Sequence, residues 1–361
     1  MKNLNEMVQE FKEFEGKIQK LRQLESKLNT LDAKGFDSEV QSIRAKLKKP
    51  QAVEDVAREL DSLKRKIEAK GVEAGATLIA PSKTGGRLPK TELGGEISVN
   101  YEVLDLIGFG GFADVYKARR KKDGRIVAIK IPRLAQFETV EPRVFLEEAE
   151  LWSRLHHPNI VEVVEYGMKP YPWISIEYME GGSLRLRIGQ LTLAESLDIA
   201  IKVCDALYYT HHLGVIHRDI KPENILSDKA NTPKLADWGL GKMMIELSMR
   251  SGSTGTPAYS SPEQVKPSKF GEVGWWTDIY QFGAVLYEMV TGKLPYKGQS
   301  PLELAMNIVD TDFAKPSEVN PKLPVEIDNV IAQCLAKDKE ERYKDISMMR
   351  SALGNIKRSL G

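Results

Sequence analysis

Apolar positions in the first 70 residues recur at steps of three and four, which is the period of an amphipathic helix. The pattern breaks at Gly35 and Pro50 and resumes after each, so it predicts three helices over residues 1–70. They either pack on one another as a small bundle or form a coiled coil that dimerises the chain or docks a helical partner. Because a coiled coil of about three heptads is only marginally stable, the pattern leaves both interpretations open. The apolar positions of the first run are Met7, Phe11, Phe14, Ile18, Leu21, Leu24, Leu28 and Leu31.

The pattern changes twice more along the chain. Residues 71–96 are rich in Gly, Pro, Ser and Thr and predict a flexible linker. Residues 97–361 then form one predicted domain, in which strands come first and helices later. This order predicts an α+β fold with a β-rich small lobe over about 97–178 and a mostly helical large lobe over about 179–361. The predicted strands are 101–108, 113–119, 126–131, 160–164 and 173–178, and the predicted helices are 141–155, 193–212, 278–291, 302–310, 325–336 and 346–357.

Composition narrows the classes of function. Lys and Arg number 52 against 51 Asp and Glu, so bulk charge does not draw the chain to nucleic acid or to anionic lipid. No apolar run has the length of a membrane-spanning helix and no signal peptide precedes the first helix, so we expect a cytoplasmic protein without a membrane partner. Cys204 and Cys334 are far apart and predict neither a disulfide framework nor a zinc site.

A glycine-rich segment between two predicted strands is the first candidate for chemistry. Residues 108–115 read Gly-Phe-Gly-Gly-Phe-Ala-Asp-Val, and their backbone N–H groups could close over phosphates. A glycine-rich hairpin without a nucleotide would have the same pattern. The segment is not a dinucleotide-binding fingerprint, because a strand rather than a helix follows it.

Charged residues in three further segments could complete a phosphate site. Lys130 ends an apolar strand, where its ammonium group needs an anion such as Glu148 or a phosphate. Asp219 and Asn224 lie in a polar loop after a long predicted helix, and Asp237 follows a short strand. One carboxylate could serve as a base while the other oxygens bind Mg²⁺ beside phosphates.

With these motifs in this order, residues 101–357 resemble the eukaryotic-type serine/threonine protein kinase family. The resemblance implies a protein kinase fold that uses ATP with Mg²⁺, or Mn²⁺ in its place. It implies Asp219 as catalytic base, Lys221 as the residue that stabilises the transferred phosphoryl group, and a Lys130–Glu148 pair that positions ATP. Asn224 and Asp237 would be the metal ligands. The residues implied for binding ATP are Ile107, Gly108, Gly110, Val115, Ala128, Lys130, Glu177, Met179 and Leu226.

The resemblance also assigns roles in the large lobe. Thr256 would contact Asp219 and Lys221 within the segment that seats the acceptor residue, and Glu263 would pair with Arg342. Asp278 would anchor the backbone of the catalytic loop. Four residues match the apolar stack that aligns in the active enzyme: Trp152, Val163, His217 and Trp238.

Three departures from the family pattern retain every catalytic group. Ala113 replaces the third glycine of the loop, and Trp238 replaces the usual Phe beside the metal-binding Asp, so the pocket around it must be larger. Ser261 stands where Ala is commoner, from which nothing follows. The segment Ser261–Gln264 resembles microbial members of the family.

The sequence therefore predicts a protein serine/threonine kinase that acts on protein substrates and phosphorylates itself. The alternative is a pseudokinase scaffold that binds nucleotide and recruits partners through its N-terminal helices; the acceptor-seating segment disfavours a small-molecule kinase. Arg218, directly before Asp219, needs a neutralising anion, which a phosphorylated loop or a carboxylate would supply. The candidate phosphorylation sites are Ser248, Ser251, Ser253 and Thr254.

Overall fold

The computed structural model describes residues 93, 95–109, 113–132, 142–169, 171–238 and 257–360, all of which belong to the compact unit Leu88–Gly361. The three predicted N-terminal helices and most of the predicted linker lie outside the described residues, so those boundaries stay predictions.

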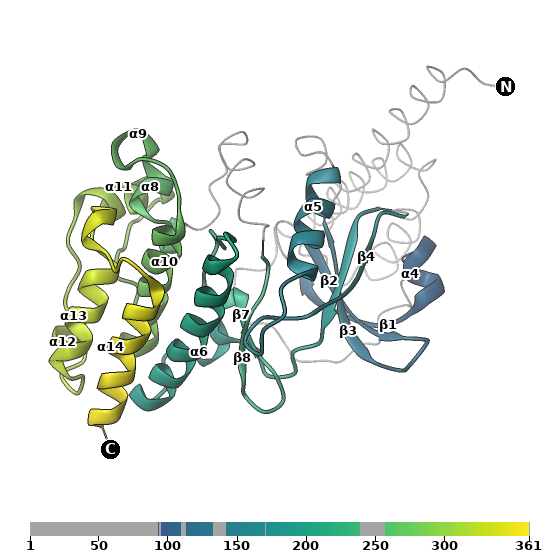
Figure 1. The fold of residues 1–361 in the computed structure, drawn as a ribbon, viewed down its shortest axis with the longest axis horizontal. Coiled ribbons are helices and arrows are strands. Elements are labelled where there is room, and N and C mark those ends of the chain that lie inside the picture. The colour runs from purple at the N-terminus through teal and green to yellow at the C-terminus, as the bar shows by residue number, and fades with distance from the viewer. Residues whose placement is uncertain are drawn as a thin grey trace, which may run out of the picture. The chain divides into compact units, whose positions relative to one another are not determined.

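The small lobe is a five-stranded antiparallel sheet in the order β1-β2-β3-β5-β4 (Figure 1). Its strands confirm the predicted small lobe, with β4 beginning three residues later than expected. The helix α5 (Pro142–Ser153) lies between β3 and β4 in the chain and contacts β4. The strands are β1 (Tyr101–Phe109), β2 (Ala113–Arg120), β3 (Ile126–Pro132), β4 (Val163–Gly167) and β5 (Trp173–Glu177).

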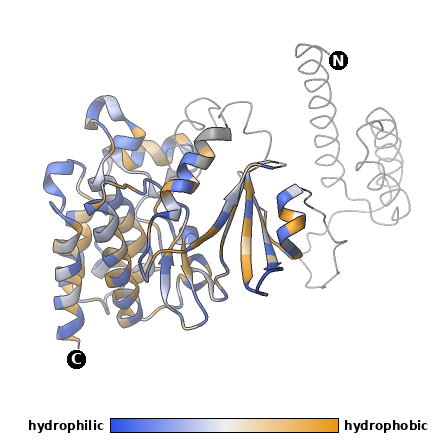
Figure 2. Cartoon of the chain, turned by 45° about the vertical axis from the view of Figure 1, so that its right-hand side comes forward, coloured by the Kyte–Doolittle hydropathy of each residue, from blue (hydrophilic) through white to orange (hydrophobic). Residues whose placement is uncertain are grey.

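Alternation along β3 gives the sheet two buried faces. Val127, Ile129 and Ile131 belong to one hydrophobic cluster, whereas Ala128 between them belongs to the main core of the domain. This is the period of two that a strand imposes on its side chains. The face opposite the main core needs its own cover, and Figure 2 shows hydrophobic residues on the short helix beside the strands.

That cover is α4 (Gly95–Asn100), which the sequence did not predict. Ile97 is fully buried against the sheet, and Tyr171 donates from its hydroxyl to the backbone oxygen of Leu93 at 2.5 Å. Tyr101 and Trp173 meet edge to face in the same cluster, with ring centroids 5.8 Å apart. The described end of the predicted linker is thus packed on the small lobe.

The large lobe is mostly helical, as predicted, and its two longest helices are α6 (Leu193–His212), which buries one face, and α10 (Trp275–Thr291), which is buried along most of its length. The N-terminus of α6 is fixed by a capping box between Thr192 and Glu195. The other helices are α8 (Pro262–Val265), α9 (Pro267–Phe270), α11 (Pro301–Asp310), α12 (Pro316–Val319), α13 (Val325–Cys334) and α14 (Ile346–Ser359), with 3-10 turns η3 (Leu184–Arg187), η4 (Pro222–Asn224), η5 (Pro257–Tyr259) and η6 (Lys339–Glu341).

A second sheet of three short strands lies where the lobes meet, in the order β6 (Gly182–Ser183), β7 (Ile225–Ser227) and β8 (Pro233–Leu235). Residues 159–161 pair with it: Leu235 N donates to Asn159 O at 2.9 Å, and Val161 N donates to Leu235 O at 3.0 Å. The predicted strand 160–164 is therefore wrong in its first half, because Ile160 and Val161 bond to β8 and β4 begins only at Val163.

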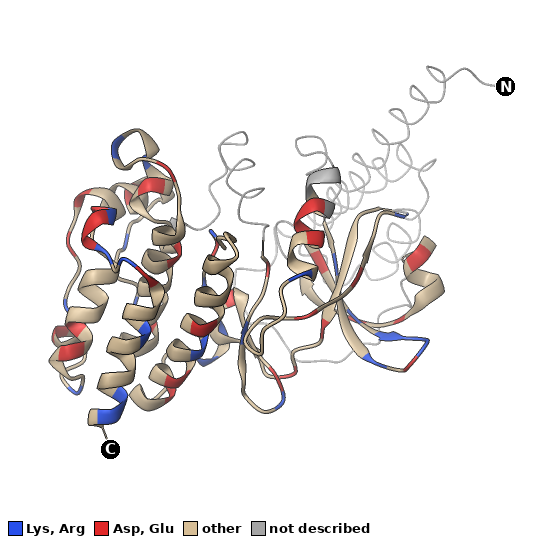
Figure 3. Cartoon of the chain, in the orientation of Figure 1, with Lys and Arg blue, Asp and Glu red and all other residues tan. Residues whose placement is uncertain are grey.

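Among the described helices, none is both long enough and apolar enough to cross a bilayer. Acidic and basic residues are interspersed over the described elements rather than gathered by sign (Figure 3). Cys204 and Cys334 are both buried and free.

Candidate active site

The loop that follows α6 is held by one buried carboxylate. Asp278, fully buried on α10, accepts hydrogen bonds from the backbone N–H groups of His217 at 2.9 Å and Arg218 at 2.8 Å. His211 Nε2 lies 2.8 Å from the same carboxylate. This confirms the expected anchoring role of Asp278, and it fixes the backbone directly before Asp219.

Arg218 adopts a left-handed backbone conformation, with φ of 67°, which is unfavourable for a residue with a side chain. Its carbonyl oxygen accepts from Gln264 Nε2 at 2.9 Å and from Gln281 Nε2 at 3.0 Å, and Gln281 Oε1 accepts from Ile220 N at 2.9 Å. Together with the two bonds to Asp278, five side-chain hydrogen bonds therefore hold this strained turn. The sequence analysis missed both glutamines, although Gln281 lies one helical turn after Asp278.

Asp219 lies at the centre of a polar cluster built from its own loop. Lys221 Nζ is 2.7 Å from Asp219 Oδ2, and Asn224 Nδ2 donates to the backbone oxygen of Asp219 at 2.8 Å and to Oδ2 at 3.0 Å. Proline at the start of η4 and the turn it begins bring Asn224 back toward Asp219. One oxygen of the Asp219 carboxylate is thus held, and the other can face a substrate hydroxyl.

Asp237 follows β8 and faces the small lobe. Its φ of 65° turns the chain sharply after the strand, and its Oδ2 lies 2.7 Å from Lys130 Nζ on β3. Ala236 N donates to Asn224 O at 2.8 Å, which brings the segment before Asp237 beside the catalytic loop. Asp237 therefore supplies an anion to the Lys130 ammonium. Glu148 is buried on α5, and its pairing with Lys130 stays a prediction.

The electrostatics of this cluster favour charged groups at neutral pH. Burial opposes the charge of Lys221, but the Asp219 carboxylate outweighs it and raises the pKa of Lys221 above its ordinary value. Burial likewise opposes ionisation of Asp237, but Lys130, and then Lys221, lower the pKa of that carboxyl. The pKa shifts of Lys221 and Asp237 therefore both favour the charged form of the side chain.

Four of the apolar residues expected to hold adenine belong to the main hydrophobic core or pack against it. Ala128 and Met179 are buried in the main core, and Val115 and Leu226 pack against it. Ile107 on β1 is 43% exposed. Gly108 pairs with Val115 across the strands, where an added Cβ would meet the Val115 Cβ at 3.2 Å. The common role of these residues in binding adenine stays a prediction.

Glu177 has a role that the sequence analysis did not predict. Both of its carboxylate oxygens lie 2.8 Å from Lys234 Nζ on β8, and Oε1 also accepts from Glu162 N at 2.8 Å. Glu177 ends β5 in the small lobe and Lys234 belongs to the sheet between the lobes. This side chain therefore ties the two lobes together beside the predicted adenine site.

Two members of the predicted apolar stack, His217 and Trp238, are in contact. Trp152 and Trp238 are almost fully buried, and His217 meets Trp238 edge to face at a centroid distance of 4.6 Å. Trp238 donates from its indole nitrogen to Leu235 O at 3.1 Å, so the larger ring in place of Phe has a partner for its polar atom. Trp152 does the same toward Val161 O at 2.8 Å.

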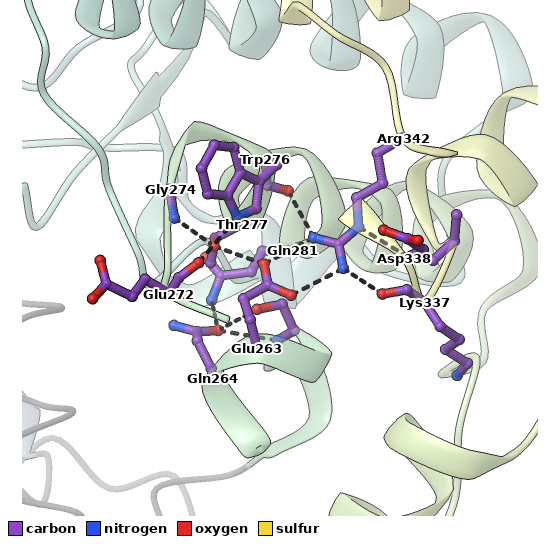
Figure 4. Close-up of polar contacts among 12 residues, drawn as sticks. Glu263, Gln264, Glu272, Gly274, Trp276, Thr277, Gln281, Lys337, Asp338 and Arg342 are labelled. Atoms are coloured by element: carbon purple, nitrogen blue, oxygen red, sulfur yellow. Dashed lines mark hydrogen bonds and ion pairs between the residues drawn. The ribbon is translucent and has the colours of Figure 1, made fainter. Parts of the chain in front are cut away.

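The acceptor-seating segment is fastened by a buried ion pair, as predicted. Arg342 reaches both oxygens of Glu263, with Nη1 to Oε1 at 2.8 Å and Nη2 to Oε2 at 2.9 Å, and neither side chain is exposed (Figure 4). Thr277 also donates to Glu263 Oε1 at 2.7 Å. Burial opposes ionisation of Glu263, but Arg342 outweighs it and lowers the pKa of the carboxyl.

Several predicted site residues lie outside the described residues. They are Gly110, Thr256 and the four candidate phosphorylation sites Ser248, Ser251, Ser253 and Thr254. The roles assigned to them stay predictions.

The donor set fits a hard divalent cation that binds together with a phosphate ligand. No group of three His, Cys, Asp or Glu side chains that could hold a metal occurs in the described part of the chain. Mg²⁺ seldom uses such an all-protein cage and instead takes one or two protein oxygens beside phosphate oxygens. Asn224 and Asp237 offer an amide oxygen and a carboxylate of that kind.

Comparisons with known proteins agree with this geometry. The family model described as "Protein kinase domain" matches residues 101–353. The serine/threonine-protein kinase PknB of Mycobacterium leprae is 35% identical over 270 residues, covering 71% of this chain and 43% of that protein. A probable serine/threonine-protein kinase of Clostridium perfringens is 36% identical over 266 residues, covering 72% of this chain and 38% of that protein. The chain thus spans less than half the length of these relatives.

A solved structure shows the same fold. The kinase domain of PknI from Mycobacterium tuberculosis superposes with a TM-score of 0.57 at 24% sequence identity, covering 71% of this chain and 96% of that one.

Proposed function

The chain belongs to the eukaryotic-type serine/threonine protein kinase family, and from that membership we propose that it transfers the γ-phosphoryl group of ATP to Ser and Thr hydroxyl groups of proteins. The observation that carries the proposal is the cluster of Asp219, Lys221 and Asn224 against the Lys130–Asp237 pair. No catalytic group of the family pattern is replaced, which favours an active kinase over a pseudokinase scaffold.

Asp219 acts on the acceptor. Its Oδ2 is held by Lys221 and Asn224, so the carboxylate has a fixed orientation and can accept the proton of the attacking hydroxyl. Because phosphoryl transfer needs little covalent chemistry from the protein, this positioning contributes much of the rate.

Lys130 and Lys221 act on the phosphates. Lys130 comes from β3 above the site and would hold the α and β phosphates, and Lys221 would stabilise the γ-phosphoryl oxygens as they move. The family generally uses ATP with Mg²⁺, and Asn224 and Asp237 would hold the metal here. When bound, Mg²⁺ neutralises charge on the phosphate oxygens.

The first 70 residues extend the proposal to partners. We infer that their amphipathic stripes bring two chains together or recruit a helical partner. Sedimentation of the whole chain beside a chain shortened to begin at Leu88 tests the homodimer; two monomers reject it. The start at Leu88 keeps Leu93, which is buried against the small lobe. A cytoplasmic location and the absence of membrane and nucleic-acid partners stay predictions from hydropathy and charge.

The test of the function is incubation of the full chain and of its Asp219→Asn variant with Mg-ATP, followed by intact mass and site mapping. Phosphate on the wild type alone supports an active, self-phosphorylating kinase. Absence of phosphate on both, and on added protein substrates, contradicts the proposal.

A further inference from the structure

Arg185 on η3 connects three parts of the large lobe. Its Nε donates to Glu223 Oε1 at 2.8 Å, its Nη1 donates to Glu288 Oε1 at 2.7 Å, and its Nη2 donates to the Tyr259 hydroxyl. Burial opposes its charge, but hydrogen bonds to Glu223, Glu288 and Tyr259 outweigh it and raise the pKa of Arg185. The guanidinium is therefore a fixed cation between two carboxylates.

The two carboxylates are linked to the catalytic loop and to the segment predicted to seat the acceptor, because Glu223 belongs to the first and Glu288 accepts from Tyr259 in the second. Glu223 follows Asp219 by four positions in the catalytic loop, and Tyr259 follows Thr256 by three positions in the acceptor-seating segment. Two carboxylates within reach of one guanidinium form a subsite that suits a basic side chain. In this chain an internal side chain already fills that subsite.

Little of the negative charge is left for a substrate. Glu288 is almost fully buried, and its second oxygen accepts from the Tyr259 hydroxyl at 2.5 Å, so both of its oxygens have donors. Only Glu223 is well exposed, with 47% of its side chain accessible, and it shares its charge with Arg185. A basic residue of the substrate would have to displace a guanidinium held by three partners.

We propose that Arg185 is a specificity-determining residue, which fills the Glu223–Glu288 subsite and makes this enzyme select acceptor segments that carry neutral or acidic rather than basic residues at that position. The proposal rests on the proposed kinase function and names its substrate class.

Peptide binding to the full chain tests the proposal without requiring turnover. The probes are fluorescent peptides with one Ser in a neutral background, each with a single Arg at one of the flanking positions, in Mg²⁺ and a non-hydrolysable ATP analogue. For the wild type we expect each Arg peptide to bind within about twofold of the neutral peptide. For Arg185→Ala we expect about a tenfold gain for Arg at one or two positions, the size of one charge-assisted contact.

Arg187→Ala is the matched control. Arg187 lies two residues further along η3 and pairs with Glu195 at 3.1 Å, away from the catalytic loop. We expect it to leave the ratio between Arg and neutral peptides unchanged. A folded Arg185→Ala variant that gains no affinity for any Arg peptide overturns the proposal.

Glu223→Gln decides the question even if Arg185→Ala fails to fold, because Glu223 is well exposed. If Arg185 fills the subsite, Glu223→Gln in a chain that keeps Arg185 leaves the affinity for Arg peptides unchanged. A wild type that prefers an Arg peptide and loses that preference in Glu223→Gln overturns the proposal. Phosphate transfer to the neutral peptide is measured in parallel: binding as expected without transfer contradicts the kinase function and leaves the role of Arg185 standing.

Discussion

Lys130 and Asp237 form an ion pair at 2.7 Å, although 107 positions separate them in the sequence. The pair joins the central strand of the small lobe to the segment after β8. Burial opposes ionisation of Asp237, but Lys130 outweighs it and lowers the pKa of that carboxyl, so the pair holds Asp237 in its charged form.

Replacing Lys130 by Met is expected to lower phosphoryl transfer at least about 100-fold, because a preorganised cation that faces the phosphates is lost. Initial rates at saturating Mg-ATP measure the effect. The control is Lys122→Met, at a residue that is 65% exposed in the β2–β3 turn. Equal loss in both variants would show that the Lys130 effect is not specific to the site.

Glu263→Gln is expected to lower the free energy of unfolding by about 3 to 5 kcal/mol, since it leaves the buried Arg342 guanidinium without its counter-charge. Urea unfolding measures this. Lys344→Met is the matched control, because the Lys344–Glu340 pair is exposed and should contribute no more than about 0.5 kcal/mol. A loss under about 1 kcal/mol in Glu263→Gln would contradict a structural role for the buried pair.

Ile97→Ala is expected to destabilise the domain by about 2 to 4 kcal/mol, because Ile97 is fully buried between α4 and the sheet. Val99→Ala, on the same short helix at a residue that is 71% exposed, should change stability by less than about 0.5 kcal/mol. Thermal unfolding compares the two. Similar values would mean that α4 is not part of the folded core.

Burial of Lys337 should make the free energy of unfolding rise with pH. Burial lowers the pKa of Lys337 to about 8, so between about pH 8 and 10 the unfolded chain binds a proton that the folded chain does not. The free energy of unfolding should therefore gain about 1 to 2 kcal/mol from pH 7.5 to 9.5 through this group. Urea unfolding of Lys337→Met across that range should lack this gain; an identical pH dependence in both chains contradicts it.

Alanine at Ser248, Ser251, Ser253 and Thr254 together is expected to lower turnover at least about tenfold. The reason is Arg218, whose buried Nε has no hydrogen-bond partner among the described residues and whose charge a loop phosphate would neutralise. Steady-state rates after preincubation with Mg-ATP measure the effect. Unchanged turnover would favour a carboxylate as the partner of Arg218.

The elements that the sequence predicted well are those with a local signal. The periodic runs of α6 and of β1 to β3 were placed within a few residues, and Asp219, Lys221 and Asn224 were found because they share one short loop. The misses depend on distant contacts. Nothing in the β-branched stretch around Ile97 predicts a helix, which forms because the sheet needs cover, and the apolar pair Ile160–Val161 does not reveal that β8 is its partner. Arg185 escaped notice for the same reason, since Glu288 lies 103 positions away.

The strand β8 shares hydrogen bonds with both lobes. Its Leu235 pairs with Asn159 and Val161 on one side and with Ile225 of β7 on the other, while Lys234 holds Glu177. We therefore expect the lobes to open by a rotation about an axis that lies near β8. Atoms close to a rotation axis move least. Asp237, two residues after the end of β8, should therefore keep its position while the ends of β1 and β2 far from the axis move through a larger distance. Nucleotide could thus enter and leave while the carboxylate that we propose as a metal ligand keeps its position.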